Sequence, residues 1–150
     1  MSDIELPASW RELQRAARDV RLRAWAPYSR FAVGAALLTV SGEVITGCNV
    51  ENASWGLTIC AERSAVCHAV AIGHREFQAI CISLTGLAVP CGACRQFLME
   101  FGSELLVLLD DAASAEGTQP EVVRLSELLP RAFRLNSVST AEPRPGSGPG

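Results

Sequence analysis

The sequence predicts an α/β protein in which helices cover both faces of one mixed five-stranded sheet, a three-layer α/β/α arrangement. The chain has 150 residues, which is the usual length of a single domain. Hydrophobic residues make up 49% of it, enough for a chain of this size to bury a core without disulfide support. Helical and strand-like patterns alternate along the chain in the order α-β-β-α-β-α-β-β-α, which is typical of helices packed on both faces of a sheet.

The N-terminal half is expected to contain one helix and a pair of strands. Ser9 and Glu12 have the spacing of a capping box, and apolar residues follow at helical intervals until Pro27 ends the helix. An apolar segment, a turn at Ser41 and Gly42, and a second apolar segment then predict a hairpin. The two predicted strands and the polar loop after them cover residues 31–40, 44–48 and 49–58.

The C-terminal half is expected to alternate helices with strands. A helix closed by Gly73 is apolar nearly all round, which predicts burial. A second helix begins at Pro90 and is closed by Gly102. The expected helices and strands cover residues 60–72, 79–84, 90–101, 104–109, 122–125 and 126–129. Pro and Gly dominate the end of the chain, so we expect a domain over residues 1–138 and a disordered tail over 139–150.

Charge and hydropathy exclude several classes of function. The net charge of −3 argues against a non-specific nucleic-acid-binding surface, which needs a basic face. Charged residues are 19% of the chain, below the average of about 25%, which favours a subunit that buries surface against copies of itself. No secretory signal and no long apolar run are visible, so we expect a cytoplasmic protein without a membrane segment.

Three of the six cysteines have the spacing of a metal site. Cys91 and Cys94 lie in one helical turn, and Cys60 begins another helix, so the three sulfurs can meet at one Zn²⁺. Three protein ligands leave the fourth position open for water, as in catalytic zinc sites. Glu62 is close enough to move protons there, and Arg63 can donate hydrogen bonds to a thiolate.

The alternative to a catalytic zinc site is a closed structural zinc site, which needs a fourth protein ligand. Cys67 lies too far along its helix from Cys60 to share the ion, and His68 points to another face. We therefore expect Cys67 to be a small buried core residue, as we do the two other cysteines that lie in apolar segments, Cys48 and Cys81.

The motifs CAE at residues 60–62 and PCGAC at residues 90–94 resemble those of zinc-dependent cytidine deaminases. The closest similarity is to the small homotetrameric type that acts on free nucleosides. Three further segments resemble that family: APYSRFAVGAAL at residues 26–37, GCNVENA at 47–53 and LLPRAF at 128–133. The resemblance covers roughly residues 9–134.

The resemblance implies hydrolytic deamination of cytidine and 2′-deoxycytidine in pyrimidine salvage, with one zinc ion per subunit. It implies that Cys60, Cys91 and Cys94 bind zinc, and that Glu62 moves protons from water to the base and then to the leaving amino group. The implied substrate-binding residues are Phe31, Asn49, Glu51, Ala53, Trp55 and Phe133.

Within that set, Asn49 and Glu51 are implied to hold the ribose 3′-hydroxyl, and Phe31 is implied to form an aromatic wall against the base. Phe133 matches the C-terminal aromatic residue that a neighbouring subunit contributes to the pocket in this family, so the resemblance implies the same role here. Trp55 replaces the usual Tyr or Phe, and its indole can stack but offers no acceptor oxygen.

Two other functions compete with a free-nucleoside deaminase. A deaminase of nucleotides or of bases within RNA or DNA usually has His as its first zinc ligand, and Glu51 would repel a 3′-phosphate. A zinc-binding interaction module without catalysis would have no use for Glu62 or for an open coordination position.

Overall fold

The computed structural model describes residues 4–87 and 89–135, and these form five strands and four α-helices. The strands are β1 (Gly34–Thr39), β2 (Val44–Cys48), β3 (Phe77–Leu84), β4 (Leu106–Asp111) and β5 (Glu121–Arg124). The helices are α1 (Trp10–Arg21), α2 (Ala61–Ala71), α3 (Gly92–Met99) and α4 (Leu125–Leu128). The predicted tail over 139–150 lies outside the described residues.

One sheet holds all five strands in the order β2-β1-β3-β4-β5. The pairs β1–β2, β1–β3 and β4–β5 are antiparallel, whereas β3 and β4 are parallel and are connected through α3. The prediction of a mixed five-stranded sheet is therefore confirmed. Because β3 and β4 are parallel, their carboxyl ends lie side by side at the same end of the sheet.

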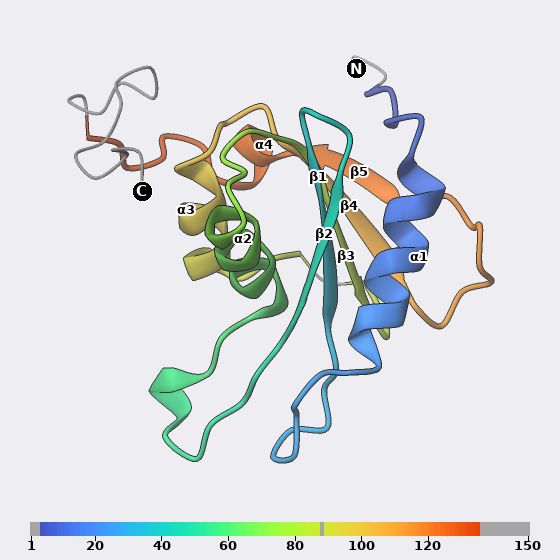
Figure 1. The fold of residues 1–150 in the computed structure, drawn as a ribbon, viewed down its shortest axis with the longest axis vertical. Helices are drawn as coiled ribbons and strands as arrows, with labels where there is room; N and C mark the ends of the chain where they lie inside the picture. Colours follow the sequence, from blue (N-terminus) through green and yellow to red (C-terminus); the bar gives the residue numbers. More distant parts are fainter. Residues whose placement is uncertain (1–3, 88, 136–150) are drawn as a thin grey trace.

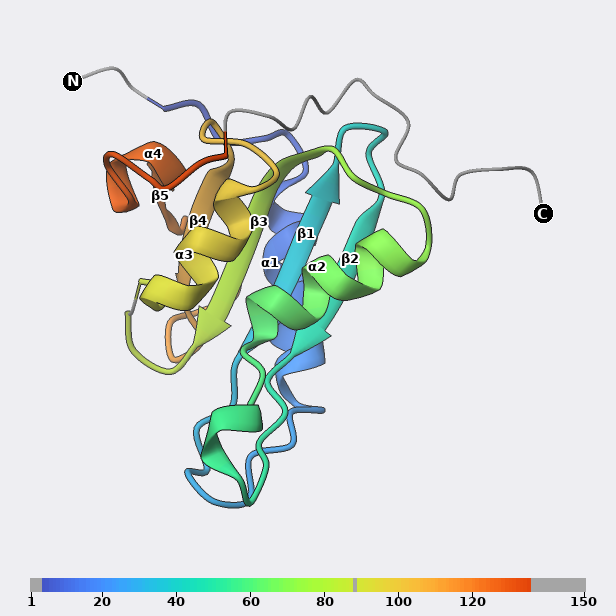
Figure 2. The same cartoon turned by 90° about the vertical axis from the view of Figure 1, so that its left-hand side faces the viewer.

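Helices cover both faces of this sheet, as predicted. Figure 1 shows α1 on one side of the sheet and α2 and α3 on the other, and Figure 2 shows α2 and α3 crossing in front of the strands. Each face has its own apolar cluster, because successive strand residues point to opposite sides. Leu37 and Ile80 pack in the cluster under α2 and α3, whereas Leu38 and Cys81 pack in the cluster under α1.

Two glycines allow the helices to lie very close to the sheet. A Cβ atom on Gly47 in β2 would overlap the backbone nitrogen of Ala65 in α2. A Cβ atom on Gly34 in β1 would overlap the carbonyl oxygen of Ala17 in α1. The absence of a side chain at these positions therefore fixes the depth at which each helix packs.

The structure corrects the predicted ends of the first helix. The side chain of Ser9 makes no capping hydrogen bond, so the predicted capping box is wrong. The chain enters the helix through a turn instead, in which the Trp10 N–H donates to the Pro7 carbonyl at 2.9 Å. The helix ends at Arg21, well before Pro27, because the N–H of Arg23 bonds to Val20 in a tighter turn.

The predicted burial of the second helix on all sides is also wrong for the single chain. Only the face of α2 that lies on the sheet is buried. Val70 on the other face is 37% exposed, and the C-cap residue Ile72 is 56% exposed. Cys67 is exposed rather than part of the core, whereas Cys81 is buried as predicted and Cys48 is half-buried. An apolar sequence pattern cannot say whether a helix is covered by its own chain or by another one.

Within the described residues, no helix is both long enough and apolar enough to cross a membrane.

Candidate active site

The starts of α2 and α3 bring three cysteine thiols together. Cys60 is the N-cap residue of α2, Cys91 is the N-cap residue of α3, and Cys94 lies in the first turn of α3. All three Sγ atoms lie within 4.8 Å of one another. The Sγ atoms of Cys60 and Cys91 are 3.9 Å apart. The two helices place these sulfurs at their positive ends, which favours thiolates there.

These thiols fit a zinc ion with one open coordination position. Sulfur ligands suit Zn²⁺, and three of them leave the fourth tetrahedral position free. Within residues 4–87 and 89–135, no further Cys, His, Asp or Glu joins this cluster of three. His68 instead has its Nδ1 atom 3.0 Å from the Thr46 carbonyl oxygen, and Cys67 faces solvent. The arrangement does not favour a closed structural site.

The thiols of Cys60 and Cys94 differ in how readily they lose a proton. A hydrogen bond from the Cys94 thiol and a further one from Arg63 lower the pKa of Cys60 to about 5, against the opposing effect of burial. Donating that hydrogen bond, together with burial, raises the pKa of Cys94. Of these two thiols, Cys60 is the one better prepared to bind a metal ion as a thiolate.

Arg63 lies beside the cluster and supplies positive charge to it. Its Nη2 atom is 3.7 Å from the Sγ of Cys60 and 3.4 Å from the Thr58 carbonyl oxygen. Its Nε atom is buried and has no hydrogen-bond partner in the part of the chain that the structure describes. A half-buried cation with an unused, buried donor atom fits a group of three thiolates, whose combined charge exceeds that of Zn²⁺ by one.

Glu62 is a buried carboxyl in the first turn of α2, two residues after Cys60. It is only 4% exposed. Burial raises the pKa of Glu62 above its ordinary value, because the charged form loses hydration. A carboxyl whose two protonation states are closer in energy at neutral pH is suited to moving protons.

The Asn49 side chain forms hydrogen bonds with the backbone of the segment that carries Phe31. Its Oδ1 atom accepts the Val33 N–H at 2.8 Å, and its Nδ2 atom donates to the Phe31 carbonyl at 2.8 Å. Its side chain is buried, whereas the ring of Phe31 is 48% exposed. Sequence reasoning missed this link, since nothing in the spacing from Phe31 to Asn49 indicates it.

Glu51 holds the turn that precedes Phe31. Its Oε1 atom accepts the N–H groups of Tyr28 and Ser29 at 2.9 and 3.1 Å. Hydrogen bonds from Ser29 and Tyr28 hold the pKa of Glu51 below its ordinary value, so this carboxylate stays charged. The structure therefore groups Asn49 and Glu51 around one loop.

The remaining predicted binding residues lie on the surface. Trp55 begins a short 3₁₀-helix (Trp55–Leu57) and is 81% exposed, and Ala53 is also exposed. Phe133 is 70% exposed, and its carbonyl accepts a hydrogen bond from the Gln96 side chain of α3 at 3.1 Å. Two large aromatic side chains thus face outward from a single chain.

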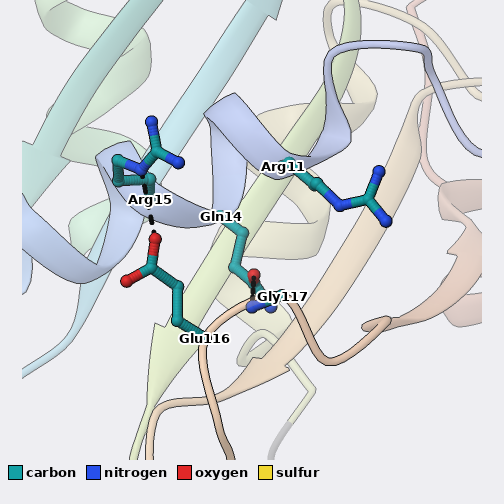
Figure 3. Close-up of a pocket in the computed structure, with 5 residues that line it drawn as sticks. All are labelled: Arg11, Gln14, Arg15, Glu116 and Gly117. Carbon is teal, nitrogen blue, oxygen red and sulfur yellow. Dashed lines mark hydrogen bonds and ion pairs between the residues drawn. The ribbon is translucent and has the colours of Figure 1, made fainter.

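A surface pocket lies away from this cluster, between α1 and the loop before β5. It is lined by Arg11, Gln14, Arg15, Glu116 and Gly117 (Figure 3). Arg15 and Glu116 form an exposed ion pair at 3.1 Å across it. None of the residues predicted for the active site lines this pocket.

The fold and the cysteine cluster define a class of protein: an α/β protein with a three-thiol metal site at two helix starts. Comparison with known proteins identifies the family. The family model for the cytidine and deoxycytidylate deaminase zinc-binding region matches residues 8–109, and the chain belongs to this family of zinc-dependent enzymes.

Relatives and solved structures agree with that assignment. The cytidine deaminase of Mycobacterium tuberculosis strain H37Rv is 45% identical over 132 residues, which cover 86% of this chain and 92% of that protein. A crystal structure of cytidine deaminase from Burkholderia pseudomallei is 46% identical, with a TM-score of 0.75, covering 81% of this chain and 97% of that one. A crystal structure of the Mycobacterium tuberculosis enzyme has a TM-score of 0.71 and 42% identity, covering 86% and 100%.

Proposed function

We propose that this chain catalyses the hydrolytic deamination of cytidine and 2′-deoxycytidine to uridine and 2′-deoxyuridine, with release of ammonia, in pyrimidine salvage. One observation carries the proposal: three thiols within 4.8 Å of one another stand at two helix starts, with the buried Glu62 in the first turn of one of them. This combination supplies both a metal site and a proton carrier. The catalytic domain covers residues 1–138 in this proposal.

The chain's own residues divide the chemistry between them. Cys60, Cys91 and Cys94 would hold zinc, and the ion, when bound, activates a water molecule for addition at C4 of the cytosine ring. Glu62 takes a proton from that water and delivers it to N3. Glu62 then transfers the second water proton to the amino group, which leaves as ammonia as the C4 carbonyl forms.

The loop residues bind the nucleoside. Asn49 uses one donor and one acceptor within the chain, and an amide retains a second of each for a ribose hydroxyl. Glu51 supplies a carboxylate to the same hydroxyl and disfavours a 3′-phosphate. Phe31 forms the wall against the base, and Ala53 contacts the base edge through its backbone.

The active enzyme is a homotetramer in this proposal, and Phe133 and Trp55 complete the site across subunit boundaries. Exposed apolar side chains support it, because this much apolar surface on one chain indicates an interface. The most exposed of them are Leu22, Trp25, Trp55, Leu57, Phe133 and Leu135, each more than 60% exposed. We further propose a cytoplasmic location and no nucleic-acid partner.

Ultraviolet absorbance tests this function. The purified zinc-loaded protein is incubated separately with cytidine, 2′-deoxycytidine, deoxycytidylate and a cytosine-containing oligonucleotide. We expect turnover of the two nucleosides only. Turnover of the oligonucleotide or the nucleotide without the nucleosides would contradict the proposed substrate class, and a zinc-loaded protein inactive on all four would indicate a binding module. Light scattering then reports the oligomeric state, with a tetramer expected.

A further inference from the structure

Arg21 stands at the C-terminal end of α1 and reaches toward the segment that carries Phe31. Its Nε atom donates to the Ala32 carbonyl at 3.0 Å, and its Nη2 atom donates to the Thr85 hydroxyl at 2.7 Å. We propose that Arg21 is a positioning residue that fixes the Phe31 wall for the pyrimidine base. This inference rests on the proposed function, because Phe31 has a role only if the chain binds a nucleoside.

The segment 31–33 is held mostly by side chains, and one backbone hydrogen bond, from the Asn49 N–H to the Val33 carbonyl at 3.3 Å, joins it to the residue after β2. Ser29 Oγ accepts the Phe31 N–H at 3.0 Å, and Asn49 bonds to the Phe31 carbonyl and the Val33 N–H. Arg21 donates to the Ala32 carbonyl, which lies between the Phe31 carbonyl and the Val33 N–H along the backbone. Four backbone groups of three consecutive residues are thereby engaged by side chains, so Phe31 has a fixed place despite its exposed ring.

Packing explains why Arg21 reaches this segment. The missing side chain of Gly34 lets the last turn of α1 lie against the start of β1, and a Cβ atom there would come within 2.7 Å of the Arg21 backbone nitrogen. Arg21 therefore sits directly above the point at which segment 31–33 enters the strand. A guanidinium group can bridge two acceptors at fixed directions, which a lysine ammonium group cannot reproduce.

The second hydrogen-bond partner of Arg21 is Thr85, which connects the positioning of Phe31 to the segment that leads to the cysteine cluster. Thr85 follows β3 directly and begins the connection to Cys91. The neighbouring Gly86 N–H donates to the Asp111 carboxylate at 2.9 Å, which fixes the start of that connection. Arg21 thus joins the segment that carries the predicted base wall to the segment before a predicted zinc ligand.

The experiment compares Arg21→Ala and Arg21→Lys with the wild type, and uses Arg15→Ala as the matched control. Arg15 is on the same helix, and its partner Glu116 lies in the pocket of Figure 3, away from the cluster. Arg21→Ala removes two hydrogen bonds, of which the one to the Ala32 carbonyl holds the Phe31 segment. Losing that one charged hydrogen bond should raise KM for cytidine roughly tenfold, with kcat within about twofold. Arg21→Lys should give an intermediate KM, and zinc content and Arg15→Ala kinetics should match the wild type.

A second measurement separates this inference from the proposed function. Hydrogen exchange of the peptide that contains residues 29–34 should become faster in Arg21→Ala and remain unchanged in Arg15→Ala, whether or not the protein turns over cytidine. An unchanged KM, or a kcat that falls in proportion to lost zinc, would overturn the positioning role. Unchanged exchange would overturn it as well. An inactive wild type with faster exchange in Arg21→Ala would instead refute the proposed function and retain the anchoring of this segment.

Discussion

Two buried carboxyl groups on opposite faces of the sheet have contrasting environments. Asp110 at the end of β4 is 2% exposed and faces α1, whereas Glu62 is 4% exposed and lies under α2. Arg18 reaches both Asp110 oxygens at 2.8 Å. Gln14 and Ser83 each donate a further hydrogen bond to Asp110 at 2.7 Å.

The two environments shift the two pKa values in opposite directions. Burial alone would raise the pKa of Asp110, but the hydrogen bonds from Arg18, Ser83 and Gln14 outweigh it and hold the pKa below the ordinary value. Burial dominates at Glu62 and raises its pKa. A buried carboxylate with donors on all sides serves stability, whereas one that is poorly compensated is prepared for proton transfer.

Glu62→Gln gives the largest expected effect and tests the catalytic half of this comparison. The amide keeps the shape of the side chain but cannot accept and release protons, so kcat for cytidine should fall by about 10²–10⁴-fold. Zinc content should stay at one ion per chain, measured by atomic absorption. Urea unfolding should show no loss of stability, because burial penalises the charged form that the variant removes. Activity within tenfold of the wild type would contradict the assignment.

Asp110→Ala tests the structural half. Removing the carboxylate takes away the charged acceptor that Arg18 and Gln14 share, and Arg18 is itself mostly buried. Among the described residues, Arg18 then keeps only neutral acceptors such as the Ser114 and Asp111 carbonyls. We expect a loss of about 3 kcal/mol in the free energy of unfolding, measured by urea denaturation. The kcat of the folded, zinc-loaded variant should equal that of the wild type. A large loss of kcat without a loss of stability would reverse the roles of the two carboxyls.

Arg63→Gln should have a smaller effect, confined to the face that carries the cysteines. Losing the donor near the Cys60 sulfur should lower zinc affinity or kcat by about 10–100-fold, as is usual for groups that support metal ligands. Competition with a chelator measures the affinity. Arg15→Gln serves as the control, since its exposed ion pair lies on the other face. Equal zinc affinity and kcat in the two variants would exclude a role for Arg63 at the metal.

Lowering the pH should give the smallest of these effects, and it tests the lowered pKa of Asp110. The Asp110 pKa is lower in the folded than in the unfolded chain, so its contribution to stability is complete above the unfolded value of about 4 and is lost as pH falls through the folded value. The difference in urea midpoint between wild type and Asp110→Asn should therefore shrink below about pH 4. Measuring both proteins without zinc keeps metal release from contributing. A constant difference would show that ionisation of Asp110 does not matter.

Sequence reasoning located the features that depend on local spacing. Cys91 and Cys94 are neighbours on one helical turn, and Cys60 precedes a clear helix, so their meeting could be anticipated from helix geometry. The alternation of apolar segments predicted the sheet for the same reason. The bond between Gln14 and Asp110 joins residues 96 positions apart, and no local pattern indicates it. Arg21 was missed likewise, because its partners come from two other segments.

Boundaries and burial were harder to predict because tertiary contacts decide them. Ser9 has the right neighbours for a capping box, yet the Pro7 carbonyl satisfies the helix start instead. Cys67 lies in an apolar run, but the run covers both faces of α2 and only one meets the sheet. An apolar sequence pattern indicates that a surface is covered, but it does not indicate which molecule covers that surface.

The two cysteine caps have a consequence for how the two helices are held together. Neither Cys60 nor Cys91 makes a side-chain capping bond to its own helix, so both sulfurs remain available as ligands. A zinc ion held by Cys60 on one helix and by Cys91 and Cys94 on the other would act as a crosslink between the starts of α2 and α3.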